Sequence, residues 1–276
     1  MQDLWHALGI ICPMAFLAGF VDAVAGGGGL ISIPAYLFAG MPAHLALGSN
    51  KFAMSLGTFT SMLRYVQAGR VRVRTGLAAA AGALIGAPLG TSLALYIPEQ
   101  TLKSILLVLL PCVAVFLAVR RDVGAENTVP RNFSPVQGTA ISFAIGFVIG
   151  GYDGLIGPGT GTFLILAFSV VLGYDLLLAS GCAKIVNFTS NITSMLVFLL
   201  CGKVVFAVAV PAAVCAIAGN QAGARLAVRG GVRVVRLLIW VVLGLLIAKT
   251  GLELLAQARK IGYNTLLDIE CIFGGI

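Results

Sequence analysis

The segment GMPAHLALGSNK, residues 40–51, returns 133 positions later as GYDLLLASGCAK, residues 173–184. With the same offset, FTSMLRYVQAGRV at residues 59–71 returns as ITSMLVFLLCGKV at residues 192–204. Two matches at one spacing indicate that the chain arose by duplication of one unit. Each copy carries a lysine, Lys51 or Lys184, inside a long apolar segment, where a charge is costly and usually functional.

The composition predicts an all-α, polytopic transmembrane bundle. Hydrophobic residues make up 59% of the 276 residues and charged residues 10%, with a mean hydropathy of +1.02. A soluble domain of this length does not need so apolar a composition to form its core. Eight apolar runs approach the roughly 20 residues that a membrane-spanning helix requires. They cover residues 5–24, 44–66, 75–96, 101–119, 136–153, 175–200, 204–224 and 234–256.

Polar intervals divide the chain into two transmembrane repeats. We assign residues 1–119 to the first repeat, 120–134 to a polar loop between the repeats, and 135–257 to the second repeat. Residues 258–276 form a C-terminal tail in which we find no interpretable motif. The first run has no basic residue before it and no cleavage pattern, so we expect it to be retained as a helix.

The charged, cysteine and histidine residues exclude several classes of function. The net charge is +8, but the arginines cluster in short loops at helix ends, which is how membrane proteins set their orientation. Nucleic acid is therefore not an expected partner. The six cysteines and two histidines show no metal-binding spacing, and no nucleophile stands in a catalytic pattern. We expect no metal site, no cofactor and no enzymatic activity.

The basic loops change sides between the two copies. The first copy carries four arginines between residues 64 and 74, whereas the matching loop of the second copy keeps only Lys203. One helix later the bias reverses, and four arginines lie between residues 225 and 236 of the second copy. Such a reversal is typical of repeats with opposite orientations in the membrane and would place these loops and residues 120–131 on the cytoplasmic side. Parallel repeats whose charges have drifted are the alternative.

Each copy also contains a helix that its glycines should interrupt. The stretches GFVDAVAGGGG at residues 19–29 and GYDGLIGPGTGT at residues 151–162 align on Asp22 and Asp153. Glycine costs a helix about 1 kcal/mol and proline about 3 kcal/mol, and unwound backbone in a membrane must be buried in protein or line a cavity. The short apolar segments that follow, residues 30–39 and 162–172, would then be half-helices and would bring each copy to five segments. Close helix packing is the alternative role of the glycines.

The half-helix starts and a polar helix face together predict an anion-binding site. Amide hydrogens at the start of a helix attract anions. Lys184, Asn187 and Asn191 share one helical face with Ser194, and the first copy repeats this stripe more weakly after Lys51. The candidate substrate-binding residues are Gly26, Gly27, Gly28, Gly29, Asn50, Lys51, Gly157, Gly159, Thr160, Lys184, Asn187 and Asn191.

Other roles stay open for the charged members of this set. The lysines lie near the starts of their apolar runs, so their side chains could instead reach the membrane interface. We expect Asp22 and Asp153 to cap the broken helices or to pair with the lysines, and binding of a coupling proton or sodium ion is the alternative.

At these residues the chain resembles the sulfite exporter TauE/SafE family of membrane anion permeases. The resemblance rests on GFVDAVAGGGGLISIPA (residues 19–35), ALGSNK (46–51), GYDGLIGPGTGTFL (151–164) and ASGCAKIVNFTSN (179–191), and it covers both halves of the chain. It implies a multi-pass protein of the cytoplasmic membrane of a prokaryote that moves sulfite, sulfonates or related organic anions.

We therefore expect a secondary transporter that works by alternating access, with its substrate held between the two copies near the middle of the bilayer. A passive anion channel would use the same donors and is the alternative. The expected partners are a small anion, the lipid bilayer, a coupling proton or sodium ion, and in a homodimer a second copy of the chain.

Overall fold

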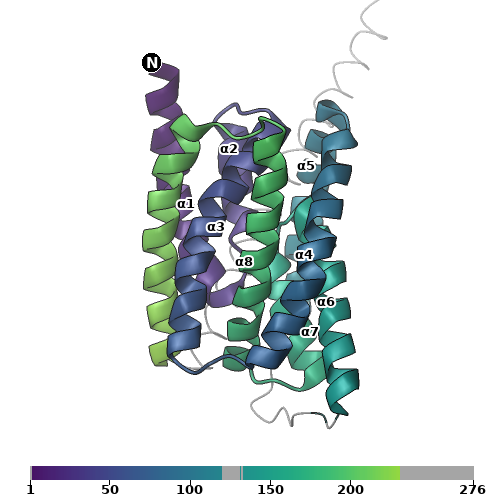
Figure 1. Ribbon diagram of the computed structural model, residues 1–276. Helices are drawn as coiled ribbons and strands as arrows, with labels where there is room; N and C mark the ends of the chain where they lie inside the picture. Colours follow the sequence, from purple (N-terminus) through teal and green to yellow (C-terminus); the bar gives the residue numbers. More distant parts are fainter. Residues whose placement is uncertain (1, 120–130, 132, 231–276) are drawn as a thin grey trace, which may run out of the picture.

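The computed structural model describes residues 2–119, 131 and 133–230, and all regular structure within these ranges is helical (Figure 1). Five of the described helices are long and apolar enough to cross a membrane, namely α1, α4, α6, α8 and a helix at Phe206–Gly230, which we call the 206–230 helix. The labelled helices are α1 (Gln2–Ala25), α2 (Gly29–Phe38), α3 (Ala43–Gln67), α4 (Val73–Tyr96), α5 (Glu99–Val119), α6 (Pro135–Leu155), α7 (Thr160–Leu172) and α8 (Leu176–Leu200).

Seven of the predicted long runs coincide with described helices, and the two predicted short segments coincide with α2 and α7. The breaks before α2 and α7 fall at the glycines, as expected. The 206–230 helix extends beyond the predicted end at residue 224, because residues 225–229 contain no glycine or proline to stop it. The predicted run at 234–256, the tail and almost all of the loop at 120–134 lie outside the described residues.

Glycines allow helices of different copies to touch backbone to backbone. Gly86 of α4 faces α6 so closely that a Cβ atom there would lie 2.2 Å from the carbonyl oxygen of Phe147. At the repeat-equivalent positions, a Cβ atom on Gly219 of the 206–230 helix would lie 2.0 Å from the carbonyl oxygen of Phe16 in α1. The fourth helix of each copy therefore packs on the first helix of the other copy, in the small-residue manner of membrane proteins.

The repeat-equivalent helices α3 and α8 lie side by side and run in opposite directions (Figure 1). Each touches the connection that follows the other. A Cβ atom on Gly48 would lie 2.0 Å from the carbonyl oxygen of Lys203, and one on Gly181 would lie 1.8 Å from that of Arg70. Gly181 lies 133 positions after Gly48, and Lys203 lies 133 positions after Arg70, so the two contacts are equivalent and the arrangement of the copies is reciprocal.

The basic segments within the described ranges gather at one end of this bundle. The connection after α3, the start of α6 and the end of the 206–230 helix all lie at the bottom of Figure 1. There Arg64 of α3 donates a hydrogen bond to Gln221 over 3.3 Å, and Arg74 of α4 donates one to the carbonyl oxygen of Pro135 over 3.2 Å.

The start of α3, by contrast, is held by a residue far along the chain. The carboxylate of Glu99, at the start of α5, accepts hydrogen bonds from the backbone amides of Ala43 and His44. The same carboxylate lies 2.6 Å from Nδ1 of His44, whose Nε2 is 3.1 Å from the carbonyl oxygen of Ala94. In the second copy the α8 start is capped locally, because Asp175 accepts from the amides of Leu177 and Leu178.

Substitution of Gly86 tests the seam between α4 and α6. We expect Gly86→Ala to lower the free energy of unfolding by roughly 1–3 kcal/mol, because the new methyl group forces two backbones apart. Thermal unfolding of the purified protein in detergent measures the change. Gly9→Ala is the matched control, since a Cβ atom at that helical glycine has no other atom within 4 Å. Equal melting temperatures for the two variants would contradict the close packing of α4 on α6 at Gly86.

Candidate functional site

The two glycine breaks cross each other at the centre of the bundle. Gly26, Gly157 and Gly159 have φ angles of 78°, 92° and 78°, in the left-handed region that favours glycine. A Cβ atom on Gly26 would also lie 2.2 Å from the carbonyl carbon of Gly161, so the breaks pack backbone against backbone. Across this crossing, the hydroxyl of Thr162 donates to the carbonyl oxygen of Ala25 over 2.7 Å. The unwound backbone is thus buried in protein.

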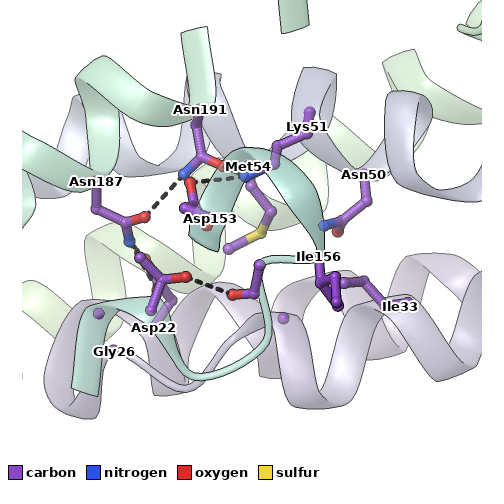
Figure 2. A pocket seen from close by; sticks show the side chains of 14 residues that line it. Asp22, Gly26, Ile33, Asn50, Lys51, Met54, Asp153, Ile156, Asn187 and Asn191 are labelled. Atoms are coloured by element: carbon purple, nitrogen blue, oxygen red, sulfur yellow. Dashed lines mark hydrogen bonds and ion pairs between the residues drawn. The ribbon is translucent and has the colours of Figure 1, made fainter. Parts of the chain in front are cut away.

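Two buried ion pairs flank the crossing, and each joins one copy to the other. Nζ of Lys51 in α3 lies 2.7 Å from Oδ2 of Asp153 in α6 (Figure 2). Nζ of Lys184 in α8 lies 2.8 Å from Oδ2 of Asp22 in α1. All four side chains are at most 4% exposed. Neither lysine reaches an interface, and both aspartates accept from lysines rather than capping a helix.

A chain of hydrogen bonds along α8 connects the two pairs. Nζ of Lys51 also donates to Oδ1 of Asn191 over 3.1 Å. The amide of Asn191 donates to Asn187 over 3.1 Å, and the amide of Asn187 donates to Asp22 over 3.2 Å. Figure 2 shows this row of side chains between the two aspartates. A change at one ion pair can therefore alter the other through these hydrogen bonds.

A small cavity of about 20 Å³ lies beside the row, between the broken helices and α3. It has room for about one water molecule and none for a larger solute. Asn50 lines it and is 5% exposed, yet its Oδ1 has no hydrogen-bond partner in the structure. A buried polar atom without a partner is costly. Oδ1 of Asn50 is therefore a polar atom that no described residue contacts by a hydrogen bond in this conformation.

The structure brings together most of the residues that the sequence singled out. The cavity is lined by Asp22, Gly26, Gly29, Asn50, Lys51, Asp153, Gly157, Thr160, Asn187 and Asn191. Four other candidates do not line it, namely Gly27, Gly28, Gly159 and Lys184. Gly28 packs on the Cβ atom of Asp22. Lys184 is fully buried behind Asp22, and its Nζ also donates a hydrogen bond to the backbone carbonyl oxygen of Asp22.

Sequence reasoning missed a second hydrogen-bond partner of Asp153. The hydroxyl of Ser190 donates to Oδ2 of Asp153 over 2.6 Å. Its position three residues after Asn187 put it beside the polar stripe, but a serine in a membrane helix commonly bonds only to its own backbone. Ile33, Met54 and Ile156 complete the apolar side of the cavity. Among the described residues no cluster of three or more histidine, cysteine or acidic side chains could hold a metal ion.

The chain is similar to known membrane proteins. The model of the family described as sulfite exporter TauE/SafE matches residues 11–250. The chain is 36% identical over 243 residues to the probable membrane transporter protein ORF9 of Sinorhizobium sp, covering 88% of this chain and 92% of that protein. It is 33% identical over 242 residues to the probable membrane transporter protein YfcA of Escherichia coli strain K12, covering 88% of each. No solved structure matches the chain.

A double-mutant cycle tests the pair of Lys184 and Asp22. Lys184→Met or Asp22→Asn alone leaves one buried charge without its partner, which costs on the order of 3–5 kcal/mol. We expect the double variant to recover most of this loss, because no unpaired charge remains. Melting temperatures in detergent give the comparison, with Lys103→Met at an exposed position as control. Losses that simply add in the double variant would show that the charges do not depend on each other.

Proposed function

Because the chain belongs to the sulfite exporter TauE/SafE family, we propose that it is a secondary transporter for small sulfur-containing or organic anions. The observation that carries this proposal is the pair of cross-copy ion pairs beside a small cavity with polar lining residues. A lysine that is buried in a membrane protein and held by a movable carboxylate can exchange that carboxylate for an anionic substrate. The relatives described above are probable membrane transporters, which agrees with this class of function.

Lys51 is the residue we assign to the substrate. Its ammonium group has three hydrogens, and Asp153 and Asn191 accept two of them. An incoming anion would take the position of the Asp153 carboxylate and would be contacted by the amide of Asn50. The cavity, at about 20 Å³, must widen for this.

The same exchange explains how a coupling ion would enter the cycle. When an anion displaces Asp153 from Lys51, Ser190 is the one side-chain partner left to Asp153 among the described residues, and the carboxylate becomes a buried charge without a counter-charge. A proton bound to Asp153 removes that cost, because the neutral carboxyl group needs no ion partner. Sodium bound between the carboxylate and nearby amide oxygens is the second solution. Proton and sodium gradients therefore distinguish the two forms of coupling.

We propose that the copies are inverted repeats, with the arginine-rich end in the cytoplasm. The reciprocal contacts of Gly48 and Gly181 and the antiparallel course of α3 and α8 support this assignment. The contacts also argue against the two copies moving as separate bodies, because α4 and the 206–230 helix are each packed on the opposite copy.

We propose that two rigid groups of helices, each with helices from both copies, move instead, and we call them the first and the second body. The first consists of α1, α2, α3 and the 206–230 helix, and the second of α6, α7, α8 and α4. Within the first body, the rings of Phe52 and Phe206 are 5.6 Å apart and the hydroxyl of Tyr65 donates to the carbonyl oxygen of Ala23 over 3.0 Å. Both ion pairs and the crossing of the glycine breaks lie between the bodies, where a change of charge would favour opening.

Flux into proteoliposomes tests the proposed substrate site. We expect saturable uptake of one or more of sulfite, thiosulfate, a sulfonate and a carboxylate, stimulated by an imposed proton or sodium gradient. Lys51→Met should reduce this flux at least tenfold, because the positive charge that binds the anion is lost. Lys103→Met, at an exposed lysine, should leave it unchanged. Full flux in the Lys51→Met, Lys184→Met double variant would refute the lysine role, and flux that is neither saturable nor coupled would indicate a channel.

Cross-linking tests the two mixed bodies. The hydroxyl of Ser55 donates to the sulfur of Met195 over 3.4 Å, so cysteines at these positions of α3 and α8 would bridge the bodies. We expect a disulfide in the Ser55→Cys, Met195→Cys variant to block transport until it is reduced. The control is the native pair Cys12 and Cys215, whose thiols lie within hydrogen-bonding reach inside the first body. Oxidising that pair should leave transport intact, and a block there would contradict these bodies.

A further inference from the structure

A second and larger cavity lies at the arginine-rich end of the bundle, away from the ion pairs. Its volume is about 180 Å³, against about 20 Å³ for the central cavity, and the two share no lining residue. It is bounded by the starts of α4 and α6, the end of α7 and the segment that leads into α8. The polar side chains that line it include Arg72, Arg74, Thr75, Arg131, Thr139 and Tyr174.

Three arginines line this cavity, and none of them forms an ion pair with a carboxylate in the described part of the chain. Two of them are held in place by other contacts. The guanidinium group of Arg72 lies 5.4 Å from the centre of the Tyr174 ring. Arg74 donates from Nε to the hydroxyl of Thr139 over 3.3 Å and from Nη2 to the carbonyl oxygen of Pro135. The cavity is therefore a preformed cluster of positive charge.

The surrounding backbone adds to this positive potential. α4 begins at Val73 and α6 at Pro135, so the positive ends of two helix dipoles meet at the cavity. The hydroxyls of Thr75 and Tyr174 lie 2.7 Å apart and form one more polar group on its wall. Planar guanidinium groups, hydroxyls and helix starts are the groups that proteins use to bind phosphate.

Exposed aliphatic side chains stand next to lining residues of the cavity in the sequence, and we infer that they form its rim. Val73 is 59% exposed and Val136 is 77% exposed, and both follow directly on lining residues of the cavity. Leu77, one turn further along α4, is 59% exposed. A charged recess whose edge continues into exposed aliphatic side chains at the end of membrane-spanning helices matches a ligand with a phosphate head and hydrocarbon chains. Free phosphate would gain nothing from this rim.

We propose that this arginine cavity binds the phosphate group of an anionic phospholipid. Basic recesses between transmembrane helices on the cytoplasmic side are suited to anionic lipid head groups. All the elements that line the cavity belong to the second body, so the lipid would hold α4 against α6 and α7 without bridging the moving parts. The site does not depend on which anion the central cavity carries.

The test uses the full-length protein, purified in detergent, with three added probes. We expect phosphatidylglycerol to raise the melting temperature and to remain bound in native mass spectrometry, whereas phosphatidylcholine and inorganic phosphate do neither. Arg131→Gln should weaken phosphatidylglycerol binding about fivefold, the effect of one basic residue near an anionic membrane surface. Arg72→Gln together with Arg131→Gln should weaken it further.

Arg229→Gln is the matched control, because this exposed arginine of the 206–230 helix does not line the cavity. The side chain of Arg131 makes no hydrogen bond or ion pair to another described residue, so Arg131→Gln should fold normally even where the double variant does not. Equal stabilisation by inorganic phosphate would identify a free anion as the ligand and overturn the lipid assignment. Equal binding of both lipids, or an equal loss in Arg229→Gln, would show that the cavity has no lipid specificity.

Discussion

The structure depends on the burial of two lysine–aspartate pairs in a medium that tolerates neither charge alone. A lysine inside a bilayer costs on the order of 2.5–3.5 kcal/mol even on the most permissive scales, and an aspartate is similarly costly. Here each lysine meets an aspartate of the other copy, so neither copy can bury its charges alone. Each copy thus supplies the counter-charge for the lysine that the other copy buries.

The glycines are what allow the charges to meet. Asp22 and Asp153 stand in the last turn or two of α1 and α6, just before each helix breaks. The left-handed turns at Gly26 and Gly157 redirect the chain, and the absence of side chains lets the two breaks cross in contact. Glycines likewise allow α4 to pack closely on α6 and the 206–230 helix to pack closely on α1.

Much of this organisation could be predicted from the sequence, because membrane constraints are simple. Apolar runs, glycine breaks and buried lysines can each be recognised from a short stretch of sequence, because each reflects a local physical constraint. The partners of the lysines could not be fixed in this way, since pairing Lys51 with Asp153 requires the packing of segments about a hundred residues apart. His44 is a second example, because it is buried against Glu99, which follows in the chain only after α4.

The two copies are equivalent in backbone but not in side chains, and this asymmetry bears on how a transporter of this design would work. The positions in the first copy that match Asn187 and Asn191 are Met54 and Thr58, so the bridging row of amides belongs to α8 alone. Conversely, Asn50 beside Lys51 is matched by Ala183 beside Lys184. Lys51 accordingly borders the cavity while Lys184 stays sealed behind Asp22.

Inverted repeats would allow two end states in which each copy adopts the conformation of the other. If their side chains were identical, Lys51 would bind the substrate in one state and Lys184 in the other. The asymmetry prevents that exchange. Lys184 does not border the cavity, and the amide of its neighbour Asn187 already donates to Asp22. The substrate would therefore stay with Lys51 in both states, while the pair of Lys184 and Asp22 would stay intact. In the proposed inverted arrangement, the similar backbones of the two copies would offer two conformations, and the difference in side chains would leave one binding site for both.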